Sequence, residues 1–183
     1  MCFKNGIAKV PPILAEFQFE HYFSRKINDM EKIDALNQVA AFHRTFQHPV
    51  LDEPTIPSES RCNLRVALLA EELDELRQAI TDNDLVEVAD ALCDIQYVLA
   101  GAILEFGLGE KFVTLFNEVQ RSNMSKACVS RAEAEATQAH YLAKDGTESY
   151  IRELNGQWLV YRKGDDKTLK SINYSPADLK DLL

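Results

Sequence analysis

The stretch LLAEELDEL, residues 68–76, combines a helical repeat of apolar side chains with three glutamates. Its pattern extends over a helix predicted at about 60–80, in which four apolar residues share one stripe: Leu69, Leu73, Leu76 and Ile80. At about 100° per residue, Glu72 and Glu75 flank this stripe and Glu71 lies beyond them. A solvated helix face is the ordinary explanation for such acids, so this stretch alone does not establish a site.

A second acidic stretch, EVADALCDIQYVLAG at residues 87–101, follows the break TDND. Asp84 is the predicted N-cap of a helix over about 85–106, which should stop where glycines follow it. Glu87, Asp90 and Asp94 are spaced by three and four residues, so they share one arc. That arc faces away from the apolar residues Leu85, Val88, Leu92, Ile95 and Leu99.

Little of the surface of this second helix is expected to face solvent, because Tyr97, Val98 and Gly101 lie near its acidic side. Buried carboxylates without partners are costly, whereas a divalent cation satisfies several at once. A short turn between the helices would bring the two acid sets together. Oxygen-only ligands favour magnesium or manganese over zinc. A di-iron bundle is the competing reading, but it requires a histidine three residues after a glutamate, and no histidine here is so placed.

Most of the remaining chain is also predicted to be helical. Helices are expected over 13–23, from a capping-box start at Asn28 to about Phe46, over about 110–121, and through SRAEAEATQAHYLA. The prolines of HPVLDEPTIPSES mark a loop. Asn155-Gly156 between two β-favouring runs predicts a hairpin, and Ser175-Pro176 predicts a short final helix. The expected fold is all-α, a bundle of about four to five core helices with a small C-terminal β-hairpin tail.

Composition places the chain among globular proteins, with 46% hydrophobic and 27% charged residues. A net charge of −9 argues against a partner that is a nucleic acid polymer. Four scattered cysteines form no CxxC pair, and no segment has the length and apolarity of a membrane span or signal peptide. We therefore expect a cytoplasmic protein with reduced thiols.

The segment EVQRSNMSK, residues 118–126, places three candidate phosphate-binding side chains at the end of a helix: Arg121, Asn123 and Lys126. Cations at a helix C-terminus are also favoured by the helix dipole, which is the simpler explanation for this segment taken alone. Lys163, Lys167 and Lys170 could close over phosphates, although a lysine-bearing tail is more often solvated. Together with the acids, the pattern indicates phosphate chemistry.

The sequence resembles the all-α nucleoside triphosphate pyrophosphohydrolases, the MazG-like superfamily, and among them a phosphoribosyl-ATP-pyrophosphohydrolase-like branch. The superfamily signature, EExxE on one helix and ExxD on the next, reads here as Glu71-Glu72-x-x-Glu75 and Glu87-x-x-Asp90. EVQRSNMSK and the tail WLVYRKGDDKTLKSINYSPADL also have counterparts in that branch. The resemblance covers roughly residues 42–183.

The resemblance implies hydrolysis of a (deoxy)nucleoside triphosphate between the α and β phosphates, giving a monophosphate and pyrophosphate. Glu72, Glu75, Glu87 and Asp90 would bind Mg²⁺, or Mn²⁺ in its place. Glu71 would be a further ligand or the base for the attacking water, and Glu75 is the other catalytic candidate. Asp94, one turn further on, would orient the ligands or serve only as a polar partner inside the bundle.

The expectations for the nucleobase and for assembly are less specific. Phe42, His43 and Phe46 could stack on a base, although aromatic residues at this spacing are more often core. The resemblance implies a homodimer or homotetramer. We expect an N-terminal extension over 1–27, the catalytic core over 28–126, and a helical arm, hairpin and final helix over 127–183. The alternative is a non-catalytic helical module that binds nucleotides or another protein.

Overall fold

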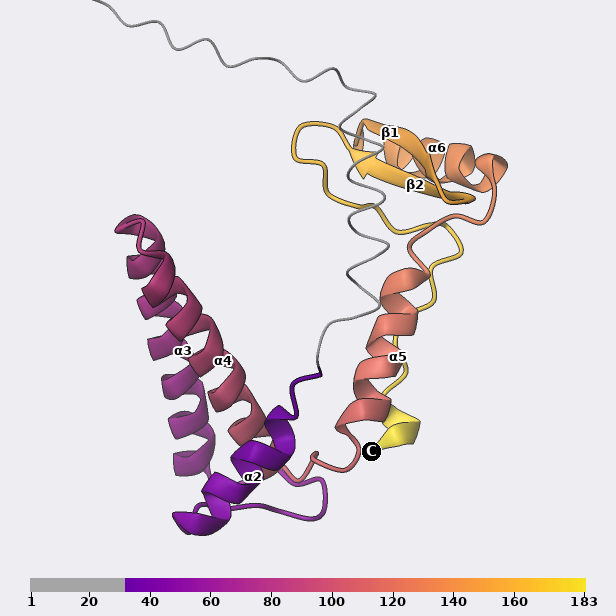
Figure 1. The fold of residues 1–183 in the computed structure, drawn as a ribbon. Helices are drawn as coiled ribbons and strands as arrows, with labels where there is room; N and C mark the ends of the chain where they lie inside the picture. The colour runs from indigo at the N-terminus through magenta and orange to yellow at the C-terminus, as the bar shows by residue number, and fades with distance from the viewer. Residues whose placement is uncertain (1–31) are drawn as a thin grey trace, which may run out of the picture. The chain divides into compact units, whose positions relative to one another are not determined.

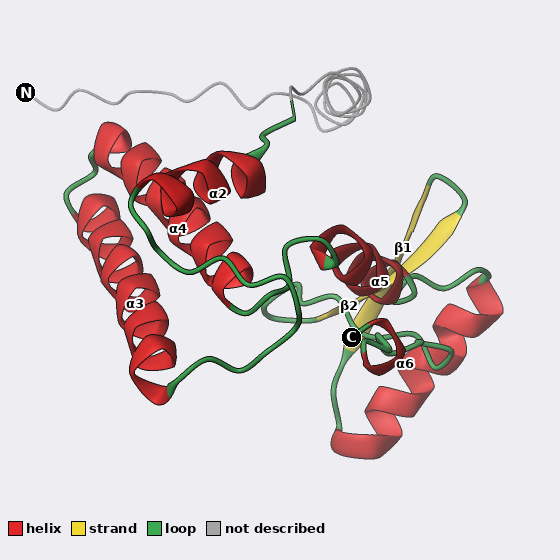
Figure 2. Ribbon diagram, turned by 90° about the horizontal axis from the view of Figure 1, so that it is seen from below, coloured by secondary structure: helices red, strands yellow, loops and turns green. Residues whose placement is uncertain are grey.

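The computed structural model describes residues 32–183 (Figure 1), and the chain divides into two units, Met1–Ala35 and Leu36–Leu183. The described residues form five α-helices and one antiparallel hairpin (Figure 2): α2 (Ala35–Thr45), α3 (Glu59–Thr81), α4 (Leu85–Glu105), α5 (Phe112–Met124), α6 (Arg131–Asp145), β1 (Ser149–Leu154) and β2 (Gln157–Arg162). A 3₁₀ turn, Lys180–Leu182, follows. The all-α fold with a small C-terminal hairpin is therefore confirmed. No helix in this part of the chain is long and apolar enough to cross a membrane.

Helices α3 and α4 form an antiparallel pair joined by a turn of three residues, Asp82 to Asp84. Asn83 adopts a positive φ of 55°, which asparagine tolerates better than most residues. The Asp84 carboxylate accepts hydrogen bonds from the backbone N–H groups of Val86 and Glu87, which confirms it as the N-cap of α4. The turn therefore fixes where the acidic segments of the two helices meet.

The contact between α3 and α4 is centred on small residues near this turn. Ala79 and Ala91 are both buried, and short side chains let two helices approach closely. The predicted leucine stripe is only partly buried: Leu69 and Leu76 are half-buried, whereas Leu73 and Ile80 are exposed. Leu69 and Leu76 lie on the side of α3 that also carries Ala79, whereas Leu73 and Ile80 lie outside the contact with α4, so the four residues are not buried together.

Exposed apolar residues instead form a second surface, which we call the apolar face of the helix pair: Val66, Leu73 and Ile80 on α3, and Leu85, Leu92 and Leu99 on α4. Within each helix these residues follow one another at steps of seven, so they share one side. Ile80 is 61% exposed and Leu85 79% exposed. Helical spacing places this face on the side of the pair opposite Glu75 and Asp90.

A buried polar network fixes the other end of the pair. Glu105, 1% exposed at the end of α4, accepts hydrogen bonds from Arg61 and Arg65 of α3. The Arg65 guanidinium also lies 3.4 Å from Nε2 of the buried His43 on α2. A Cβ at Gly101 would lie 2.9 Å from both Arg65 Nη1 and His43 Nε2, so this network leaves no room for a side chain there.

The Pro-rich loop packs against the end of α4, as expected of a non-helical connection. Thr55 N–H donates to the carbonyl of Phe106 at 3.0 Å. Gly107 has a φ of 68°, and a Cβ there would lie 1.9 Å from the carbonyl oxygen of Glu53. Glycine is therefore required at this helix end both for its conformation and for the close approach of the loop.

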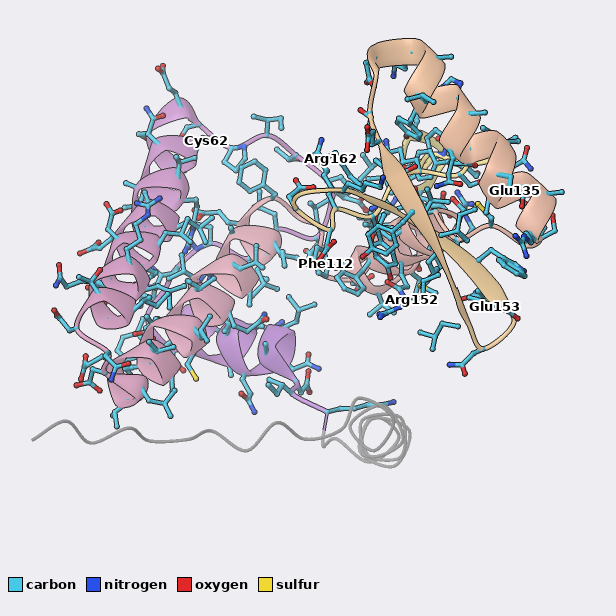
Figure 3. All side chains as sticks on the ribbon, turned by 90° about the horizontal axis from the view of Figure 1, so that it is seen from above. Cys62, Phe112, Glu135, Arg152, Glu153 and Arg162 are labelled. Carbon is cyan, nitrogen blue, oxygen red and sulfur yellow. The ribbon has the colours of Figure 1, made fainter. Side chains whose placement is uncertain are left out.

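The C-terminal segments form their own small core around Cys128, Ala134, Val160 and Leu169, with Tyr141, Ile151 and Trp158 packed against it. Asn155 and Gly156 both have positive φ, which confirms the hairpin predicted from Asn-Gly. Charged side chains cover the outer surface, for example Glu135 on α6 and Arg152 and Glu153 on β1 (Figure 3). Cys62, Cys93 and Cys128 are free thiols.

Two predictions about helices are wrong. The helix expected from Asn28 begins only at Ala35, after an Ile33 that is exposed; the cap itself and the predicted 13–23 helix lie outside the described residues. No helix starts at Ser175-Pro176. There, Arg121 donates to Ser175 Oγ and to the carbonyl of Pro176, so a side chain of α5 occupies groups that a helix start would use.

The Glu105 network makes a prediction about stability. Burial on its own would raise the pKa of Glu105, but hydrogen bonds and charges from Arg61 and Arg65 outweigh it and hold the pKa below the ordinary 4.5. Glu105→Gln leaves two guanidinium groups without their counter-charge and should cost about 3 kcal/mol, a fall in Tm of roughly 6–12 °C. Thermal unfolding measures this, with the exposed Glu110→Gln as control.

Thermal unfolding measured as a function of pH tests whether the Glu105 carboxylate stabilises the fold in its charged form. A carboxylate with a lowered pKa contributes stability that is present above its ordinary pKa and lost as the pH falls through the lowered value. Wild type and Glu105→Gln should therefore converge in Tm under acidic conditions. Equal stability of the two proteins at neutral pH would contradict this account of the network.

Candidate functional site

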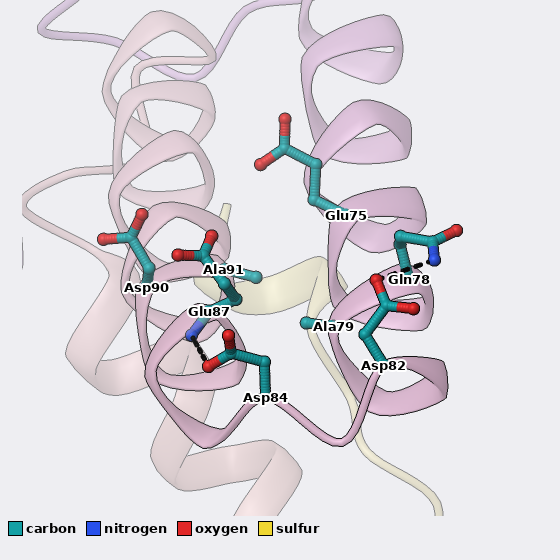
Figure 4. Close-up of a pocket in the computed structure, with 8 residues that line it drawn as sticks. All are labelled: Glu75, Gln78, Ala79, Asp82, Asp84, Glu87, Asp90 and Ala91. Atoms are coloured by element: carbon teal, nitrogen blue, oxygen red, sulfur yellow. Dashed lines mark hydrogen bonds between the residues drawn. The ribbon is translucent and has the colours of Figure 1, made fainter.

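A pocket of about 340 Å³ opens between α3 and α4 beside their turn (Figure 4). Five of the eight side chains that line it are carboxylates, and no lysine or arginine is among them: Glu75, Gln78, Ala79, Asp82, Asp84, Glu87, Asp90 and Ala91. Ala79 and Ala91 form its floor, because they are the buried residues of this set. The close contact of the two helices therefore also brings their acids into one pocket.

The carboxylates of the pocket differ in what they contact. Asp82 accepts a hydrogen bond from Gln78 Nε2 at 2.8 Å, and Asp84 caps α4. Glu75, Glu87 and Asp90 have no hydrogen bond or ion pair from their side chains within residues 32–183. These three, all predicted from the sequence, are therefore the ones available to a ligand.

Glu72 lies one turn before Glu75 on the side of α3 that faces α4. Its Oε2 atom is buried and has no hydrogen-bond partner. Burial raises the pKa of Glu72, and the neighbouring charges of Asp94, Glu75, Glu71 and Asp90 raise it further. The structure thus brings together the predicted acids of both helices around a buried oxygen atom that lacks a positive partner.

This donor set fits a hard divalent cation. Within the described residues, no three acidic, histidine or cysteine side chains converge on one point as a ready-made cage. A complete cage is not what magnesium requires, because proteins commonly hold it through one or two carboxylates together with phosphate oxygens of the substrate. The unpartnered Glu72 oxygen and its like-charged neighbours therefore fit Mg²⁺ or Mn²⁺ arriving with a phosphate.

The predicted phosphate-binding residues lie at the end of α5 and have no hydrogen bond or ion pair with the pocket acids in the described part of the chain. Arg121 uses four of its five N–H groups on Glu118, Ser175 and Pro176. Lys126 Nζ donates to Asn123 Oδ1 at 2.8 Å. Arg121 therefore has only one N–H group left to donate to a phosphate, whereas Lys126 has more donors left.

The three predicted base-binding residues are placed differently. His43 is 3% exposed; its Nδ1 lies 2.8 Å from the carbonyl of Pro49, and burial lowers its pKa. Phe42 and Phe46 are exposed, with ring centroids 4.4 Å apart. Base binding stays a prediction for the two phenylalanines, whereas His43 offers no free ring face.

Two further groups of residues were not predicted for the site. Tyr97 packs edge-on against Phe42, with centroids 5.6 Å apart. It follows Asp94 by three residues and Asp90 by seven, so the aromatic cluster lies on the acidic side of α4. Gln78 and Asp82 line the pocket three and seven residues after Glu75, a spacing by which the sequence could have identified them.

Comparison with known proteins confirms the resemblance over the helical core. Residues 39–123 match the sequence model of the phosphoribosyl-ATP pyrophosphohydrolase family, consistent with the MazG-like pyrophosphohydrolase superfamily. The matched segment contains every acid of the pocket. The chain is also similar to an uncharacterized protein of Acanthamoeba polyphaga mimivirus, with 24% identity over 84% of this chain and 97% of that protein. The family match indicates a pyrophosphohydrolase-type hydrolase.

The buried, unpartnered carboxylate of Glu72 leads to a prediction about thermal stability that does not require an activity assay. Glu72→Gln removes a charge that has no partner and lies among like charges, so in EDTA the variant should melt about 2–4 °C above wild type. With Mg²⁺ and pyrophosphate, wild type should gain stability and the variant should gain less.

Asp74→Asn is the matched control, because Asp74 is exposed on the same helix and paired with Arg77 away from the pocket. Thermal unfolding of the three proteins gives the comparison. A Glu72→Gln protein that is less stable than wild type in EDTA, and equally stabilised by magnesium, would contradict the account of this carboxylate.

Proposed function

We propose that the chain is a magnesium-dependent nucleoside triphosphate pyrophosphohydrolase that cleaves the bond between the α and β phosphates of a (deoxy)nucleotide. The products would be a nucleoside monophosphate and pyrophosphate. One observation carries the proposal: the carboxylates of Glu75, Glu87 and Asp90, which have no partner in the described residues, line one pocket, and the charges of Glu75 and Asp90 also act on Glu72, whose buried oxygen has no partner. These residues lie within the segment that matches the pyrophosphohydrolase family.

In this proposal Glu72, Glu75, Glu87 and Asp90 hold the cation. Bound magnesium supplies neutralisation of the phosphate charge and a lower pKa for a coordinated water. Asp94 of α4, whose like charge raises the pKa of Glu72, would act on the ligand carboxylates without holding the cation itself. A site made only of acids repels a nucleotide, so the cation and the triphosphate would bind together.

A carboxylate at the edge of the acidic group on α3 and α4 would accept the proton of the attacking water. Glu71 is exposed and its charge acts on Glu72, so it can accept a proton from a water near the cation. Glu75 is the second candidate, since its carboxylate has no hydrogen-bond partner in the described residues. The water oxygen would form a bond to phosphorus while the bridging P–O bond breaks, and pyrophosphate would leave with the electron pair.

Residues at the end of α5 would hold the phosphates. Lys126 and Asn123 form one polar pair there, and Arg121 retains one N–H group. Phe42 and Phe46, with Tyr97 against them, are the surface proposed for the base. Aromatic rings stack on any base, which leaves the choice among bases to polar contacts.

A homodimer or homotetramer is part of the proposal. The apolar face of α3 and α4 leaves six large apolar side chains on one side of the pair, and monomeric proteins rarely expose such contiguous surface. A second copy of the chain would cover it by an isologous contact, the commonest arrangement in homo-oligomers.

Loss of one carboxylate tests the chemistry. Glu75→Gln keeps the shape of the side chain but removes a charge proposed to hold the cation and accept a proton, so kcat should fall at least about a hundredfold. Pyrophosphate release with Mg²⁺ and with EDTA would be followed across common and deoxy triphosphates, dUTP, oxidised nucleotides and phosphoribosyl-ATP. Asp74→Asn, which neutralises the adjacent residue outside the pocket, should retain wild-type activity.

Full activity of Glu75→Gln would refute the proposed role of the acids. Absence of turnover for every nucleotide in wild type, with no effect of magnesium on Tm, would favour the non-catalytic helical module instead.

Loss of one apolar contact tests assembly. Leu92→Lys places a charge on the apolar face and should weaken self-association at least about tenfold, measured by light scattering over a dilution series. Val129→Lys is the control, because Val129 is equally apolar and 84% exposed but lies outside that face. Wild type that is monomeric at all concentrations would contradict the assembly proposed here.

A further inference from the structure

The C-terminal tail is fastened to the end of α5 through its backbone. Ser175 N–H donates to Ser125 Oγ at 2.9 Å, and Ser171 N–H donates to the carbonyl of Lys126 at 3.2 Å. Arg121 donates to Ser175 Oγ and to the Pro176 carbonyl, each at 3.0 Å. Residues 170–176 therefore hold a defined position beside the segment predicted to bind phosphate.

Arg121 is itself held in place by a carboxylate. Its guanidinium donates to both oxygens of Glu118 at 2.7 Å, and the bonds lower the pKa of Glu118 to about 2. Glu118 also accepts the backbone N–H of Asp178. Arg121 and Glu118 thus hold the tail against α5 through hydrogen bonds, and Arg121 is a positioning residue.

These hydrogen bonds place the side chain of Tyr174 at the end of α5. Its hydroxyl lies 2.9 Å from Ser122 Oγ, and Lys170 Nζ lies 4.2 Å from the centre of its ring. The bond to Ser122 and the charges of Lys170 and Lys126 lower the pKa of Tyr174. Two ammonium groups, one from the tail and one from the end of α5, therefore act on the same phenol.

Neither of these two lysines is paired with a carboxylate in the described part of the chain, in contrast to two cations of the neighbouring hairpin segment. Lys163 pairs with Glu148 and Arg162 with Asp165, whereas neither Lys126 nor Lys170 has a carboxylate partner within residues 32–183. The chain as a whole carries a net charge of −9, so carboxylates are plentiful. Two like charges that share one neighbour repel each other, and an anion between them would remove that repulsion.

We propose that Lys170 and Tyr174 of the tail join Lys126 of α5 in binding the phosphate oxygens of the nucleotide. Lysine ammonium groups bind phosphate as point charges, and a tyrosine hydroxyl adds one directed hydrogen bond. Ser122 can donate to the Tyr174 oxygen, which leaves the phenolic proton free for a phosphate oxygen. The identity of the anion as a nucleotide polyphosphate rests on the proposed function, whereas anion binding by these three residues does not.

Titration of the full chain with inorganic pyrophosphate, followed by calorimetry, tests the proposal. Lys170→Gln should weaken binding about five- to tenfold, Tyr174→Phe should weaken it less, and Lys170→Arg should keep it close to wild type. Lys180→Gln is the matched control, because Lys180 is an exposed lysine of the same tail whose charge does not act on Tyr174. Unchanged binding in Lys170→Gln, or no binding of pyrophosphate by wild type, would overturn the proposal.

Hydrogen exchange separates binding from positioning. Arg121→Gln should weaken pyrophosphate binding and also speed exchange of the backbone amides at 170–175, because it releases the tail. Lys170→Gln should weaken binding without changing that exchange. Faster exchange in both variants would mean that Lys170 acts only by holding the tail, which would overturn its role as a ligand.

Failure of this inference can be told apart from failure of the proposed function. Magnesium-dependent pyrophosphate release by wild type, with the same KM in Lys170→Gln, would refute the tail site alone. Lysine-dependent pyrophosphate binding by a wild-type protein that hydrolyses no nucleotide would support the tail site and refute the proposed function. A raised KM in Lys170→Gln with kcat little changed supports both.

Discussion

The repulsion among carboxylates where α3 meets α4 is the constraint on which the rest of this structure depends. A three-residue turn and two buried alanines hold the helices together at the point where their acids lie. This leaves Glu72 with a buried oxygen that has no partner and with like charges around it. Such an arrangement costs stability in the isolated chain, and a divalent cation with bound phosphate would offset that cost.

The remaining features make this arrangement possible. At the far end of the pair, Glu105 with Arg61 and Arg65 forms a satisfied buried network, in contrast to the unsatisfied acids near the turn. One end of α3–α4 is thereby fixed by paired charges while the other end keeps unpaired charges for a ligand. At the end of α5 the sign is reversed, since Lys126 and Lys170 lack carboxylates. The chain thus carries an acidic pocket suited to a cation and a basic segment suited to phosphate.

Local signals in the sequence were enough for the helices, for the Asp84 cap and for the Asn155-Gly156 turn, because each depends on neighbouring residues. The acids were also found, since helical spacing puts them on one arc. The exposure of Leu73 and Ile80 was missed, because it depends on which small residue of α4 meets Ala79. The prediction of a final helix was wrong for a similar reason. Arg121, more than fifty residues earlier, donates to the Ser175 hydroxyl and the Pro176 carbonyl, which a helix start would use.

The most direct test of the account asks where a divalent cation binds. Alanine methyl NMR of the full chain, with Mn²⁺ added in small amounts together with pyrophosphate, reports proximity through paramagnetic broadening. The account predicts that the methyl signals of Ala79 and Ala91, on the floor of the acidic pocket, broaden first, while the signal of Ala134 in the C-terminal core stays sharp. Sharp signals from Ala79 and Ala91 at Mn²⁺ levels that broaden other alanines would contradict it.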